Sequence, residues 1–126
     1  MDLELSTTTL DDPHGTVRAV VAATGELDLE TASQLGHQAL HALQEVSPHL
    51  VLDLHEVSFM DSTGLKVLLA AHRRAELAGG SVVLLAPTRS VSRILELTGL
   101  DQTFAVVQDV ADLPPVAVSD GAAPTA

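Results

Sequence analysis

The residues with the clearest chemical potential stand together in the segment SFMDSTGL, residues 58–65. Asp61 supplies a carboxylate, and Ser62 and Thr63 supply hydroxyls, at a point where a buried strand is expected to give way to a helix. The simpler interpretation is structural, because a Ser or Asp at a helix start caps a free backbone N–H. The alternative is a switch in which Ser62 accepts a phosphate. That phosphate would lie at the positive end of the helix, among its unpaired N–H groups.

A phosphate on Ser62 would act mainly through its charge and bulk. It would add roughly 1.5 to 2 negative charges at neutral pH. These charges would stand beside Asp61 and, if the topology brings it near, beside Asp28. The domain need not refold, but an interface that buries the Ser62 hydroxyl would be lost.

The elements that position these residues can be predicted from hydrophobic periodicity. Residues 3–9 and 16–24 predict an antiparallel hairpin. A helix should follow, because apolar residues recur there at steps of three and four. These residues are Ala32, Leu35, Ala39, Leu43 and Val46. Two signals compete for its start: Asp28 as N-cap, or Thr31 with Gln34 as a capping box.

The rest of the chain alternates between apolar strands and helices. In chain order we expect a strand over 49–54, a helix over 62–78, a strand over 81–86, a helix over 88–98, an edge strand over 104–107 and a helical turn over 109–113. This order predicts an α/β fold: a single-domain mixed β-sheet with a leading antiparallel hairpin, βαβ crossovers and helices packed on the sheet. The domain should span residues 1–113, with a disordered tail rich in Pro, Ala and Gly over 114–126.

Two loops should leave the carboxyl ends of parallel strands, at residues 25–28 and 59–64. Sites in open α/β sheets lie at such ends. The crossover places both loops on one edge of the sheet, and this brings Asp28 toward Ser62.

Composition limits the possible partners. The chain has 126 residues and a formal net charge of -11, with 17 acidic residues against 6 basic ones. Such a chain repels phosphate backbones and anionic lipids, so we predict neither a nucleic acid nor a membrane as partner. Of the basic residues only Arg18 precedes position 62. The acidic half is therefore either a solvated surface or a face that meets a basic partner. Cysteine is absent and the N-terminus is acidic, which favours the cytoplasm.

Other chemical sites have weaker signals. His37 and His41 have the i, i+4 spacing of a metal pair, but no third ligand is evident. They lie off the apolar stripe, so we expect them to be exposed and predict no metal site. The nucleophile elbow G-x-S-x-G is missing, although a hydrolase that acts through Ser62 stays open as an alternative. There is no P-loop, so we predict no nucleotide or other cofactor.

Three stretches together resemble a known family: residues 25–28 (GELD), residues 50–87 around the DSTGL motif, and residues 91–104 (VSRILELTGLDQTF). The chain is similar to the STAS domains of bacterial anti-sigma factor antagonists over about residues 3–113. The resemblance implies a STAS-like fold and a protein that binds an anti-sigma factor and thereby frees a sigma factor. That partner is typically also a serine kinase that supplies the ATP.

The resemblance also implies the roles of single residues. The kinase would phosphorylate Ser62, phosphorylation would end binding, and a separate phosphatase would reset the switch. Asp61, Thr63 and Gly64 match the flanks of the motif, and Asp28 matches the acidic loop of the family. Thr63 is a second possible acceptor. Four arginines are either solvated helix ends or part of the surface that docks the kinase: Arg73, Arg74, Arg89 and Arg93.

The main alternative within the same family is a STAS scaffold or regulatory subunit of a larger signalling or lipid-transport complex. The hydroxyl at Ser62 favours the switch, because STAS proteins that are never phosphorylated often lack one there. We therefore predict a cytoplasmic binding protein, not an enzyme.

Overall fold

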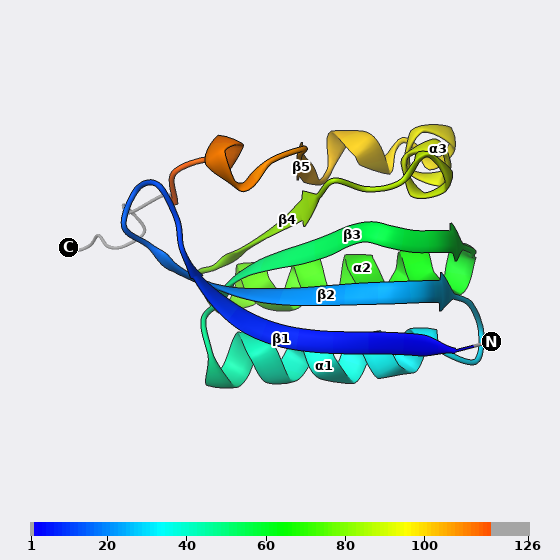
Figure 1. Ribbon diagram of the computed structural model, residues 1–126, viewed down its shortest axis with the longest axis horizontal. Helices are drawn as coiled ribbons and strands as arrows, with labels where there is room; N and C mark the ends of the chain where they lie inside the picture. The colour runs from blue at the N-terminus through cyan, green and yellow to red at the C-terminus, as the bar shows by residue number, and fades with distance from the viewer. Residues whose placement is uncertain (1, 117–126) are drawn as a thin grey trace.

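The computed structural model describes residues 2–116, which form one five-stranded mixed sheet with helices (Figure 1). The strands are β1 (Leu3–Asp11), β2 (Val17–Leu27), β3 (His49–Met60), β4 (Ser81–Leu85) and β5 (Ala105–Val107). Their order across the sheet is β1-β2-β3-β4-β5, with β1 antiparallel to β2 and the other pairs parallel. The predicted α/β class, the leading hairpin and the crossovers are confirmed.

The helices cover one face of this sheet. They are α1 (Ala32–Glu45), α2 (Ser62–Leu77) and α3 (Arg89–Thr98), with short 3-10 turns η1 (Leu100–Gln102) and η2 (Val110–Asp112). The main hydrophobic core joins apolar side chains of β2, β3 and β4 to those of all three helices. The Thr88 hydroxyl donates to the Val57 carbonyl at 2.7 Å and ties the start of α3 to β3. No helix within residues 2–116 is long and apolar enough to cross a membrane.

Strand β3 is longer than the sequence predicted. We expected it to end at residue 54, because polar residues interrupt the apolar run there, but it continues to Met60. His55 and Ser58 are exposed, whereas Val57 and Met60 are buried in the core. The carboxyl half of β3 thus has one wet face and stays paired with β2, with two shifts in register. Phe59 and Met60 are therefore strand residues, which corrects the loop expected over 59–64.

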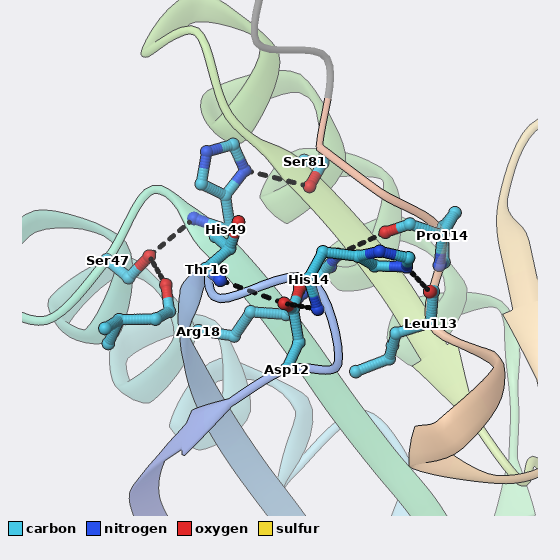
Figure 2. A network of polar contacts seen from close by, with 10 residues as sticks. Asp12, His14, Thr16, Arg18, Ser47, His49, Ser81, Leu113 and Pro114 are labelled. Atoms are coloured by element: carbon cyan, nitrogen blue, oxygen red, sulfur yellow. Dashed lines mark hydrogen bonds and ion pairs between the residues drawn. The ribbon is translucent and has the colours of Figure 1, made fainter.

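The C-terminal segment crosses the opposite face of the sheet. Leu113, 2% exposed, packs there on Val51 and Val83 in a second, smaller core. Beside it, Arg18 donates to Asp12 Oδ2 at 2.7 Å and to the Pro114 carbonyl at 2.5 Å (Figure 2). This network fastens the end of the domain to the β1–β2 hairpin. Residues 114–116 are described, whereas the rest of the predicted tail, 117–126, lies outside the described residues.

Candidate partner-binding site

The two segments that were expected to meet do so at the carboxyl ends of β2 and β3, although residues 25–27 belong to β2 and not to a loop. Leu27 and Met60 are register partners at the ends of these strands. The next residue, Asp61, donates its backbone N–H to the Leu27 carbonyl at 3.1 Å. This end of the sheet lies at the right of Figure 1, where β2 and β3 finish. The predicted placement of the Asp28 and Ser62 segments on one edge is confirmed.

Asp61 is the N-cap of α2. Its Oδ1 accepts hydrogen bonds from the backbone N–H of Thr63 at 2.8 Å and of Gly64 at 3.2 Å. This corrects one expectation, because a phosphate on Ser62 would not meet a set of unpaired helix N–H groups. Two of those groups already bind the Asp61 carboxylate. A phosphate would stand next to the Asp61 carboxylate, which is held in place by these two donors.

Ser62 is the first residue of α2, and its side chain is exposed. Within residues 2–116 no hydrogen bond involves its hydroxyl, which is therefore available to another protein. Thr63 is half-buried by comparison. Solvent access alone thus favours Ser62 over Thr63 as a modification site.

Asp28 organises the neighbouring loop. Its Oδ1 accepts from the backbone N–H of Glu30 at 3.0 Å and of Thr31 at 3.1 Å. Burial raises the pKa of Asp28, but the hydrogen bonds from Thr31 and Glu30 outweigh it and hold the pKa below its ordinary value. The carboxylate is therefore ionised and fixed in place.

Neither predicted start of the first helix is correct in full. Thr31 is the N-cap residue of α1 by position, but its side chain makes no capping hydrogen bond. Its hydroxyl instead donates to the Glu26 carbonyl at 2.5 Å and accepts from the Asp28 N–H at 3.0 Å. Thr31 therefore ties the loop to the end of β2 rather than closing a capping box with Gln34.

Gly64 allows α2 to approach the ends of both strands. A Cβ at this position would lie 2.6 Å from Met60 Cγ and 3.1 Å from the Leu27 carbonyl oxygen. Any larger residue would push α2 away from the loop that carries Asp28. Gly64 thus has a packing role that the motif alone did not reveal.

Replacing Gly64 with Ala is expected to lower the free energy of unfolding by about 2 kcal/mol, the usual cost of overpacking a filled core. Urea unfolding followed by circular dichroism measures this change. Gly36→Ala is the matched control, since a Cβ there lies 3.6 Å from Val67, an ordinary contact. An unchanged unfolding midpoint for Gly64→Ala would show that the close approach does not constrain this position.

Two apolar residues at this edge were missed by the sequence analysis. Leu29 is 78% exposed and Phe59 is 45% exposed. Leu29 follows Asp28 directly, and Phe59 pairs with Glu26 across β2 and β3. The sequence did carry a signal for Leu29, a large apolar residue between the acidic residues Asp28 and Glu30. The exposure of Phe59 could not be predicted in the same way, because the extension of β3 to Met60 was not expected. We call Asp28, Leu29, Phe59, Asp61 and Ser62 the acceptor edge.

The remaining candidates lie elsewhere. His37 and His41 are exposed on α1, as expected. Within residues 2–116 no cluster of His, Asp and Glu could hold a metal ion. His55, on the wet face of β3, binds Asp53 Oδ1 at 2.7 Å, and this hydrogen bond and charge raise the pKa of His55. All four arginines proposed for docking are exposed.

Comparison with known proteins gives a consistent result. Residues 8–113 match the family model of the STAS domain. The chain is 35% identical over 108 residues to the anti-sigma-F factor antagonist RsfB of Mycobacterium tuberculosis, an alignment that covers 84% of each protein. An anti-sigma factor antagonist from Mycobacterium paratuberculosis has a similar structure, with a TM-score of 0.68, 29% identity, and coverage of 86% of this chain and 90% of that one. The phosphorylated form of Bacillus SpoIIAA shares the fold, with a TM-score of 0.62, 23% identity, and coverage of 86% and 93%.

Proposed function

The chain belongs to the STAS domain family, and on this basis we propose that it is an anti-sigma factor antagonist switched by phosphorylation of Ser62. It binds an anti-sigma factor and so releases the sigma factor that this partner holds. The observation that carries the proposal is the exposed Ser62 hydroxyl at the start of α2, directly after the fixed Asp61 carboxylate.

The acceptor edge has the composition of a small protein-binding surface. Leu29 and Phe59 offer exposed apolar area that a partner can bury as anchor residues. Asp28 and Asp61 offer fixed negative charges, and each carboxylate is held by backbone N–H groups. A partner that contacts this edge therefore needs apolar area and positive charge, and its surface covers the Ser62 hydroxyl.

Phosphorylation reverses this complementarity. A phosphate brings roughly 1.5 to 2 negative charges to a surface that already holds the Asp28 and Asp61 carboxylates. Repulsion between the phosphate and Asp61 cannot be relieved by rotating Asp61 without losing the cap of α2. The added charge and bulk therefore act outward, on the interface.

In this mechanism the chain is a binding partner and a kinase substrate, and it is not an enzyme. The anti-sigma factor binds ATP and transfers the phosphoryl group to Ser62 Oγ, and a separate phosphatase removes it. The exchange takes place in the cytoplasm. The family relatives support this sequence of events: RsfB is named an anti-sigma-F factor antagonist, and SpoIIAA is known in a phosphorylated form.

The test is phosphorylation by an anti-sigma factor kinase with ATP, followed by mass spectrometry. The wild type is expected to gain one phosphate on Ser62, and Ser62→Ala is expected to gain none. Thr63→Val is the matched control, because it removes the neighbouring hydroxyl and should be phosphorylated like the wild type. A phosphate found on Ser62→Ala would refute Ser62 as the acceptor.

A further inference from the structure

An apolar groove lies on the surface between α1 and α2, outside the acceptor edge. One part of it is a hollow of about 150 Å³. The hollow exists because Gly36 and Ala70 have little or no side chain, and larger apolar side chains surround it. The lining includes Gly36, Leu40 and Leu43 of α1 and Val67, Ala70 and Arg74 of α2. A second hollow shares Leu40, Leu43 and Arg74 and reaches Leu77, which is 81% exposed.

The groove runs along the same helix that carries Ser62. Val67 is five residues after Ser62, and Leu77 is fifteen residues after it. At 1.5 Å of rise per residue, the groove extends from about 7 Å to about 22 Å beyond the phosphorylation site. It therefore begins within two helical turns of Ser62 and is long enough for two to three turns of a partner helix.

The charge around the groove differs from that of the rest of the chain. Lys66, Arg73 and Arg74 are all exposed on α2, and they are half of the six basic residues in the chain. The acidic residues of α1 and α2 are only Glu45 and Glu76. Arg74 lines the groove itself, and Lys66 and Arg73 lie on the same helix, so positive charge gathers at α2 on a molecule with a net charge of -11.

We propose that this groove binds an acidic amphipathic helix of the anti-sigma factor, so that the partner contacts α1 and α2 as well as the acceptor edge. The inference rests on the proposed function and adds the surface that supplies affinity independent of Ser62. Apolar side chains of the partner helix fill the hollow at Gly36 and Ala70, and its acidic side chains face Arg74 and Lys66. Docking of an amphipathic helix into an apolar groove is a common mode of recognition.

Charge favours this occupant over a second copy of the chain. A symmetric pair would bring the basic borders of two identical grooves together. Neither of the two long helices offers an acidic face to the groove, because α2 carries the basic residues and α1 has a single acidic residue, Glu45. An acidic helix from another protein has neither difficulty.

The test measures affinity for the anti-sigma factor by isothermal titration calorimetry, with three groove variants of the unphosphorylated chain. Gly36→Ala should raise the thermal midpoint, because Ala favours a helix over Gly and the added methyl makes an ordinary contact with Val67. It should lower the affinity about fivefold, because the methyl narrows the hollow. Arg74→Glu should lower the affinity at least tenfold, and Arg74→Gln should lower it less and weaken its dependence on salt. Thr8→Glu is the matched control, because Thr8 is exposed on β1, away from the groove and the acceptor edge, and this variant should bind within about twofold of the wild type.

The outcomes separate this inference from the proposed function. If wild type binds and the groove variants bind equally well, the groove proposal is wrong and the acceptor edge alone makes the interface. If Arg74→Glu binds more tightly, the occupant is not acidic and the proposal is also wrong. Failure of the wild type itself to bind any anti-sigma factor refutes the proposed function and the groove proposal with it. A groove variant that instead changes self-association in sedimentation experiments identifies a second copy as the occupant and overturns the proposal.

Discussion

Replacing Ser62 with Asp is expected to weaken binding to the anti-sigma factor about 30-fold, or roughly 2 kcal/mol. The substitution places a carboxylate where the interface needs an uncharged hydroxyl, directly beside the fixed charge of Asp61. An acidic residue in the first turn of a helix is favourable in itself. The variant should therefore fold at least as well as the wild type, and the loss should appear in binding alone.

Ser62→Asn is the control that isolates charge from size, because Asn has the shape of Asp without its charge. Its affinity should stay within about threefold of that of the wild type, and Ser62→Ala should bind like the wild type. The difference between Asp and Asn should shrink as salt is added. Equal affinities for the wild type and Ser62→Asp, measured by titration at low salt, would contradict the electrostatic mechanism.

The sequence was sufficient for the order of the elements and for the meeting of the two loops. Both depend on strong local signals, namely apolar periodicity and the handedness of βαβ crossovers. The sequence did not predict where β3 ends, because the last part of this strand is buried on one face only. Beyond Leu54 one face of β3 is wet, so residues such as His55 and Ser58 look like loop residues in the sequence although the strand is still paired with β2.

The details of the acceptor edge could not be predicted for a different reason. Which residue caps a helix depends on side-chain geometry, because Asp28 and Thr31 at α1, and Asp61 and Ser62 at α2, could each have served by residue type. The exposure of Phe59 and the tight fit of Gly64 against Met60 depend on tertiary packing. No property of the residue alone reports these contacts. The groove beside Gly36 is of the same kind, because it forms only when α1 and α2 pack together.

Replacing Arg18 with Met is expected to lower the free energy of unfolding by about 3 kcal/mol, because it removes one partner of a buried ion pair. The Arg18 side chain is 1% exposed, and its Nε donates to Asp12 Oδ2 at 2.7 Å. Met keeps the apolar stem but leaves the Asp12 carboxylate with backbone donors only, from His14 and Thr16. It also removes the hydrogen bond that holds the Pro114 carbonyl (Figure 2).

The double variant Asp12→Asn with Arg18→Met tests whether the loss comes from the unpaired charge. If the unpaired charge causes the loss, the double variant should recover much of the stability, because burying a neutral amide costs less free energy than burying a carboxylate. Affinity for the anti-sigma factor should not change in the folded protein. Arg18 lies near the start of β2 and the acceptor edge at its end, about 30 Å away at 3.3 Å per strand residue.

The dependence of stability on pH provides the second check on this ion pair. Burial raises the pKa of Asp12, but the hydrogen bonds from Arg18, Thr16 and His14 outweigh it and lower the pKa to about 2. A depressed pKa in the folded state stabilises the protein above the unfolded value, near 3.8, and that stability is lost as the pH falls toward 2. Arg18→Met should raise the Asp12 pKa, so the variant should lose less stability than the wild type between pH 5 and pH 2. Parallel unfolding curves for the two proteins over this range would mean that Arg18 does not set the ionisation of Asp12.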